Sequence, residues 1–126
     1  MLATVADCQF DVERGPDWLL VKVPKLDADP AAPRQLAERL WDLLQQHFTY
    51  RLVLELDQIA VLSSTLIAQL IQLSTRIREH DGVLRLCGLS PYNRHVLHTC
   101  ALEDRFPAYD SREEAVMGSC HPRQPR

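Results

Sequence analysis

One short stretch, residues 52–71, already dictates the class of fold, because a strand runs there almost directly into a long helix. Leu52, Leu54 and Leu56 alternate with other residues, and a period of two is typical of a strand. From about Ser64 the apolar residues recur at intervals of three and four, which predicts a helix with one buried face. A sheet with helices packed against it is the architecture that this change of period favours.

Strand-like and helix-like segments alternate along the rest of the chain as well. Besides 50–56, strands are predicted near residues 8–13, 18–23, 83–87 and 105–108. Helices are predicted near residues 31–48, 64–81, 92–100 and 111–118. We therefore expect an α/β fold in one domain over residues 1–118, with a mixed β-sheet of about five strands and about four helices. The last residues, 119–126, contain two prolines and no apolar pattern, and we expect a disordered tail there.

Helical periodicity also predicts which side chains face the core. In the helix near 31–48 the inward residues are Leu36, Leu40, Leu43, Leu44 and Phe48. In the helix that begins near Ser64 they are Leu66, Leu70, Leu73 and Ile77, while the outward residues are Gln69, Gln72, Arg76 and Glu79. In the helix near 92–100 they are Val96, Leu97 and Cys100. Gly82 is expected to take the left-handed conformation that often ends a helix.

Helix starts are marked by side chains that can cap unpaired backbone N–H groups. Asp29 precedes Pro30, and Ser90 precedes Pro91, which is the usual order of a cap and a first-turn proline. Residues 111–114 (Ser-Arg-Glu-Glu) fit a capping box, in which the serine and the second glutamate bond each other's backbone.

Charge and hydropathy exclude several classes of function. The net charge is −3 at pH 7 and the basic residues are scattered among acids, so no concentrated patch for nucleic acid is expected. No apolar run approaches the length of a membrane span, and the first ten residues lack the pattern of a signal peptide. We expect a cytoplasmic protein that binds neither nucleic acid nor a membrane.

No catalytic, metal-binding or cofactor-binding pattern stands out. His95 and His98 could share a helix face, but no third ligand at a recognisable spacing completes a metal site. No Gly-x-Ser-x-Gly motif surrounds Ser63 or Ser64, and the glycines are too dispersed to cradle a phosphate. The four cysteines form no C-x-x-C pair and are interpreted as small apolar residues plus one thiol in the tail: Cys8, Cys87, Cys100 and Cys120. We expect a protein that is not an enzyme.

Three hydroxyl residues, Ser63, Ser64 and Thr65, stand where the strand gives way to the helix. They could simply cap the helix, since serine and threonine accept hydrogen bonds from its first N–H groups. Local chemistry favours the cap, but they could also form a regulated site, because a phosphate adds about −1.5 to −2 charge and changes any surface that a partner must contact. Local chemistry leaves both interpretations open.

From residue 54 onward the ordered pieces of the chain resemble the STAS domain family, the sulfate transporter and anti-sigma factor antagonist fold. That family has an apolar strand, an Asp-Ser-[Ser/Thr]-Gly-Leu-Gly motif that opens a helix, a Gly-Gly-type turn, a second strand, a Leu-Ser-Pro-like turn and a further helix that ends in a Gly-Leu-like pair. The matching segments here are residues 54–62, 63–68, 81–82, 83–87, 88–91 and 101–102. The likeness extends more loosely from Phe10 to Val116.

The resemblance assigns roles to single residues. Ser64 falls on the serine that partner kinases phosphorylate in the family, Ser63 replaces the aspartate, and Leu66 replaces the first glycine. A register shifted by one residue would make Ser63 the acceptor, but it shortens the connection after the strand, so Ser64 is preferred. The implied partner-binding residues are Ser63, Ser64, Thr65, Leu66, Ala68 and Gln69.

The function implied by this resemblance is that of an anti-anti-sigma factor, a signalling domain without catalysis. Such a domain would bind an anti-sigma factor that is a serine kinase, phosphate on Ser64 would break the complex, and a serine phosphatase would reset it. The alternative is a phosphorylation-independent STAS module, either a stressosome-like scaffold or a subunit associated with a transporter. The replacements at Ser63 and Leu66 favour this alternative, because they remove a carboxylate and a flexible glycine beside the acceptor.

Overall fold

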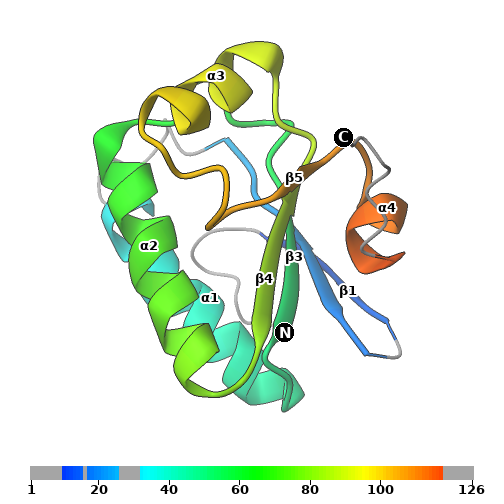
Figure 1. The fold of residues 1–126 in the computed structure, drawn as a ribbon. Helices are drawn as coiled ribbons and strands as arrows, with labels where there is room; N and C mark the ends of the chain where they lie inside the picture. Colours follow the sequence, from blue (N-terminus) through cyan, green and yellow to red (C-terminus); the bar gives the residue numbers. More distant parts are fainter. Residues whose placement is uncertain (1–9, 16, 26–31, 118–126) are drawn as a thin grey trace.

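A five-stranded sheet, with its strands in chain order, forms the centre of the computed structural model, which describes residues 10–15, 17–25 and 32–117 (Figure 1). The strands are β1 (Asp11–Arg14), β2 (Leu19–Lys22), β3 (Arg51–Glu55), β4 (Val83–Cys87) and β5 (Ala108–Tyr109). The helices are α1 (Ala32–His47), α2 (Ser64–Glu79), α3 (Pro91–Thr99) and α4 (Arg112–Met117). The predicted order of strands and helices, and the single α/β domain with a mixed sheet, are confirmed.

The sheet is mixed because its first two strands form a hairpin and the others are parallel. β1 pairs antiparallel with β2, whereas β2, β3, β4 and β5 are parallel neighbours. Each parallel pair is joined by a crossover, through α1, α2 and α3 in turn. The predicted cap of α1, Asp29 before Pro30, and the start of the predicted first strand at Cys8 lie outside the described residues.

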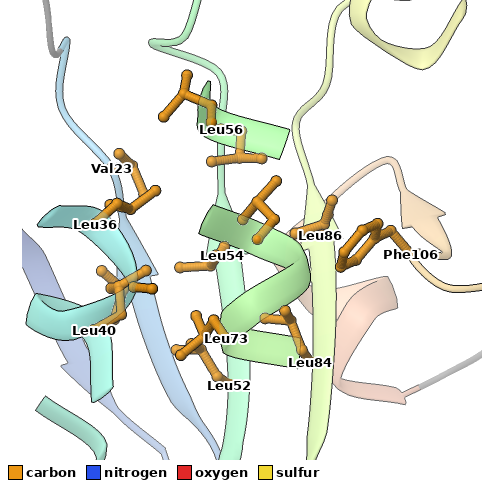
Figure 2. Packing of buried hydrophobic residues seen from close by; sticks show 14 of the residues in the cluster. Val23, Leu36, Leu40, Leu52, Leu54, Leu56, Leu73, Leu84, Leu86 and Phe106 are labelled. Atoms are coloured by element: carbon orange, nitrogen blue, oxygen red, sulfur yellow. The ribbon is translucent and has the colours of Figure 1, made fainter. Parts of the chain in front are cut away.

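The main core lies between the sheet and the helices α1 and α2, which cover one face together (Figure 1). The predicted alternation in β3 is confirmed, because Leu52, Leu54 and Leu56 all point into this core. The leucine rows predicted for the two helices meet them there. Figure 2 shows this packing, which includes Val23, Leu36, Leu40, Leu73, Leu84, Leu86 and Phe106.

The opposite face of the sheet carries a smaller apolar cluster that α4 covers (Figure 1). It contains Trp18 and Leu20 from the hairpin, Val53 from β3, Cys87 from β4 and Ala115 from α4. Short helix α4 begins as predicted, with the Oγ of its capping serine accepting from a backbone N–H in its first turn. Its glutamate reaches the N–H of the preceding residue, 110, rather than that of the cap, so the capping box is only half formed.

Phe48 was predicted to face the core and is instead 91% exposed. Helix α1 ends at His47, and Phe48 takes a left-handed conformation with φ of 54°. The N–H of Thr49 then bonds the carbonyl of Leu44 at 3.2 Å, as in a typical helix ending. The reversal of the backbone carries the phenyl ring out of the inward row.

Gly82 does not adopt the left-handed conformation predicted for it. Asp81 takes that conformation, with φ of 60°, and the N–H of Gly82 bonds the carbonyl of Ile77 at 2.9 Å. A Cβ atom on Gly82 would lie 2.1 Å from the backbone oxygen of Tyr50. Glycine is therefore needed here because the α2–β4 turn passes directly against the start of β3.

Two predictions about side-chain direction are also wrong. Cys100 was placed in the inward row of α3 but is exposed, because α3 ends at Thr99 and Cys100 only caps it. The inward position two turns nearer the start of the helix belongs to Asn93, which is fully buried. On α2, Gln69 was predicted to face outward and is half buried, with its side chain bonded to the backbone of α1.

Candidate functional site

Ser63 is the N-cap of α2. Its backbone is extended, with φ of −74° and ψ of 165°, and its Oγ accepts a hydrogen bond from the N–H of Leu66 at 3.2 Å. The carbonyl of Ser63 accepts from the N–H of Ile67 at 2.9 Å, so the helix begins without a gap. The capping interpretation of the three hydroxyls therefore applies to Ser63.

Ser64 and Thr65 are exposed on the first turn of α2 and have no hydrogen bonds from their hydroxyls within the described part of the chain. The first turn of α2 contains no acidic residue. The N–H groups of a helix start attract negative charge, so a phosphate on Ser64 would meet a favourable field within its own domain.

The other residues predicted for partner binding divide into exposed and internal ones. Ala68 is exposed one turn further along α2. Leu66 is only 7% exposed and belongs to the main core, so its side chain fixes the first turn of α2. The Oε1 atom of Gln69 accepts from the N–H of Ala37 at 2.8 Å, which ties α2 to α1. The exposed surface of this set thus consists of the three hydroxyl residues and Ala68.

Asn93 of α3 holds the loop that leads from β3 to Ser63, and sequence reasoning missed it. Its Oδ1 accepts from the N–H of Leu62 at 3.0 Å, and its Nδ2 donates to the carbonyl of Ile59 at 3.0 Å. Its own N–H bonds the Oγ of Ser90, the cap of α3, at 3.1 Å. The one available signal is the position of Asn93, four residues before the inward Leu97 on the same helix face.

A shallow groove of about 370 Å³ runs along this loop beside the start of α2. Its lining residues are Lys25, Pro33, Gln58, Ile59, Ala60, Val61, Ser63 and Leu66. Val61 is 52% exposed, which is high for an apolar residue in a loop that is otherwise well anchored. The start of α2 at Ser63 therefore borders a groove that is lined mostly by apolar residues.

Charged side chains form two ion pairs near the carboxyl ends of β2 and β3. Lys22 and Asp57 form an ion pair at 3.4 Å, and Arg112 of α4 bonds Glu55 at 2.7 Å. Burial next to Glu55 raises the pKa of the Cys87 thiol to about 12, so this thiol stays protonated at neutral pH. A protonated thiol is neither a nucleophile nor a metal ligand.

The described residues hold no group of three or more side chains that could bind a metal ion. The rings of His95 and His98 lie 6.3 Å apart, and the Nδ1 atom of His98 is 2.9 Å from a carboxylate oxygen of Glu103. Within the described ranges no helix combines the length and apolar character needed to cross a membrane.

Comparison with solved structures finds the same fold in proteins of low sequence identity. An anti-sigma factor antagonist from Mycobacterium paratuberculosis is 19% identical, covers 93% of this chain and 97% of its own, and has a TM-score of 0.71. The Bacillus cell fate determinant SpoIIAA in its phosphorylated form is 14% identical, covers 87% and 99%, and has a TM-score of 0.64. A chain from the stressosome, described as a signal integration and transduction hub, is 17% identical, covers 85% and 94%, and has a TM-score of 0.66.

A search of curated proteins gave no match. The model of the STAS domain family matches residues 26–115, which include every strand after the hairpin, the start of α2 and all lining residues of the groove beside it except Lys25. The chain belongs to the STAS domain family.

Proposed function

We propose that this chain is a non-enzymatic anti-sigma factor antagonist that is switched by phosphorylation of Ser64. Its partner is an anti-sigma factor that is also a serine kinase. The contact surface consists of Ser63, Ser64, Thr65 and Ala68 together with the groove along the 57–62 loop, and the buried Leu66 and half-buried Gln69 hold this surface in place. A serine phosphatase removes the phosphate and restores binding.

The exposed hydroxyl of Ser64, in the first turn of α2, is the observation that supports this proposal. Ser63 is less suitable as the phosphate acceptor, because its Oγ already caps the helix. Membership of the STAS family, and structural likeness to an antagonist and to a phosphorylated SpoIIAA, agree with a regulatory role for this surface.

The physical effect of the phosphate has opposite signs for the domain and for the complex. Within the domain, the phosphate lies at the positive end of α2 and stabilises it by about 0.3–1 kcal/mol. In the complex, the phosphate must lose its hydration shell where it meets the apolar side chain of Val61. The free energy of this desolvation weakens the interface enough to break it.

The test compares Ser64→Asp with Ser64→Ala for binding of the serine kinase expressed with this protein. We expect Ser64→Asp to lower the affinity at least about tenfold and Ser64→Ala to retain it. Incubation with the kinase and ATP should label the wild type on Ser64 and leave Ser64→Ala unlabelled. Calorimetry and mass spectrometry give the two readouts.

Gln72→Asp is the matched control, because Gln72 is exposed on α2 and this variant adds the same charge two turns away from the site. It should bind the kinase as the wild type does. The proposal fails if the kinase labels neither serine and if Ser64→Asp binds as tightly as Ser64→Ala.

A second function is favoured by the residues on either side of Ser64. The neutral Ser63 and the buried Leu66 leave the first turn of α2 uncharged and closely packed, which suits a constant contact surface. In that case the chain is a phosphorylation-independent STAS module of a stressosome-like assembly or of a transporter. Equal partner affinity of Ser64→Ala and Ser64→Asp, together with absence of kinase labelling, would identify this function.

A further inference from the structure

Three of the five residues of strand β4 have a neighbouring strand on one side only. β3 pairs with β4 along its whole length, from Val83 to Cys87. β5 contains two residues and pairs only with Leu86 and Cys87, at the end of β4. The first three residues of β4 therefore form an open sheet edge, at the end of the sheet opposite to β1.

The backbone of Leu84 faces this open edge. Val83 donates its N–H to the carbonyl of Tyr50, and Cys87 accepts from the N–H of Leu56, so both residues turn their backbone groups towards β3 and the loop after it. Successive residues of a strand turn these groups to opposite sides, so those of Leu84 point away from β3. One N–H donor and one carbonyl acceptor are thus available for an added strand.

A groove of about 530 Å³ lies along this edge, between β4, the end of α2 and the segment before β5. It is lined by Ser74, Arg78, Gly82, Val83, Leu84, Arg85, Asp104, Arg105, Pro107 and Tyr109. Three of these residues are arginines and one is acidic. The groove therefore combines free backbone groups with an excess of positive charge.

Two of the arginines are fixed in place and the third is free. Arg85 donates to the carbonyl of Ala115 at 2.7 Å, and Arg105 donates to the Oγ1 atom of Thr75 at 2.6 Å. Arg78 is exposed and forms no ion pair with the described residues. An unpaired guanidinium beside an open strand edge is suited to a carboxylate on an incoming chain.

We propose that this groove binds an extended acidic segment of a partner protein, which adds to the sheet beside the first half of β4. The segment bonds the backbone of Leu84 and places a carboxylate on Arg78. Residues 118–126 of this chain are a poor occupant, because they contain Arg123 and Arg126 and no acidic residue. Strand addition at a sheet edge is an established way of binding an extended peptide.

This site is separate from the one at Ser64. Arg78 and Ser64 lie in opposite end turns of α2, about 20 Å apart along the helix. A partner at the β4 edge therefore leaves the hydroxyl surface accessible, and the inference stands whether or not Ser64 is phosphorylated.

The test titrates ¹⁵N-labelled protein with an acetylated heptapeptide of alternating glutamate and valine. We expect shifts at the amides of Leu84 and Arg78, and slower hydrogen exchange at Leu84. The same peptide with lysine in place of glutamate should bind at least about tenfold more weakly, because it meets the arginines with like charge. A version with N-methylated backbone should not bind, because it lacks the donors of an added strand.

Arg78→Glu should weaken binding of the glutamate peptide about tenfold, since it replaces an attraction by a repulsion. Arg34→Glu, which changes an exposed arginine on α1, is the matched control and should change affinity less than about twofold. Dispersed amide spectra of both variants establish that they fold.

Three results would overturn the inference. The first is equal binding of the glutamate and N-methylated peptides. The second is a set of shifts confined to residues outside the groove. The third is protection of Leu84 that rises with protein concentration in the absence of peptide, because this would assign the edge to a second copy of the chain.

Discussion

Asn93 is the side chain on which the shape of the candidate site depends most directly. The loop between β3 and α2 has two buried backbone groups, the N–H of Leu62 and the carbonyl of Ile59, and Asn93 bonds both. An amide is well suited to this position because it is a donor and an acceptor at once. Since Asn93 lies in α3, two side-chain hydrogen bonds join this helix to the loop next to Ser64.

Replacement of Asn93 by leucine should destabilise the protein by about 2–4 kcal/mol, because two buried backbone groups lose their partners. Hydrogen exchange should speed up most at the amides of Leu62 and Ser64. Amides in the middle of α1 should speed up only by the factor that the loss of global stability predicts. Urea unfolding and exchange measured by NMR give both numbers. His95→Ala, at an exposed position of α3, is the control and should change stability by less than about 0.5 kcal/mol. Uniform loss of protection across the protein would contradict a local role.

At this scale the sequence predicted what depends on near neighbours and missed what depends on distant ones. Ser90 was identified as a cap, and Ser63 as one of three candidate caps, because a cap and the N–H group that donates to it lie within three residues. Asn93 bonds residues 31 and 34 positions away, and no local pattern marks such a bond. Gly82 is a similar case, because its need for glycine comes from Tyr50, the residue before β3.

Helix α4 is an element whose place on the sheet depends on one arginine. It has six residues and buries only Ala115 fully, so apolar contact holds it weakly. Arg112 binds Glu55 of β3 and Glu13 of β1, and these hydrogen bonds raise its pKa. The helix covers the cluster that contains Cys87 on the second face of the sheet.

Arg112→Ala should therefore let α4 detach and expose Cys87. We expect the rate at which iodoacetamide alkylates Cys87 in the folded protein to rise about 5–30-fold, which corresponds to about 1–2 kcal/mol for a half-buried ion pair. Mass spectrometry of the Cys87 peptide measures this rate, and exposed Cys100 supplies an internal reference.

Arg76→Ala is the matched control, because Arg76 pairs with Glu38 on the helix-covered face, away from α4. It should leave the alkylation rate of Cys87 within about twofold of the wild type, since its pair is more exposed. An equal rise in both variants would show that Cys87 is reached by global unfolding and not by detachment of α4.

The change of hydrophobic period predicted nearly every helix and strand, because most segments are long enough to show their period. β5 was expected at residues 105–108 and is formed by Ala108 and Tyr109, since a strand of two residues has no period to read. The side of the sheet that α4 occupies was not predicted. The position of α4 depends on the ion pairs of Arg112 with Glu13 of β1 and Glu55 of β3.

For the whole molecule, the buried thiol of Cys87 links global stability to alkaline pH. Burial raises the pKa of this thiol from its ordinary value of 9.0 to about 12 in the folded protein. The unfolded chain therefore loses this proton first as the pH rises. The resulting contribution to stability is complete below about pH 9 and is lost progressively between about pH 9 and 12.

The free energy of unfolding should thus fall more steeply with pH in the wild type than in Cys87→Val. Between about pH 8 and about pH 10.5, the wild type should lose about 2 kcal/mol more of its free energy of unfolding than the variant loses. Urea unfolding at the two pH values measures it, and the variant keeps a buried apolar side chain at this position. Parallel curves for the two proteins would rule out Cys87 as the source.

Because the five strands lie in the sheet in the same order as in the chain, no strand has to be inserted between two that are already paired. During synthesis, each new strand can add to the edge formed by the strand made just before it, once its crossover helix has been made. The growing edge moves from β2 to β3 to β4, and the hairpin remains at the opposite end throughout. The nascent chain can therefore build its sheet in one direction, from the amino-terminal hairpin onward.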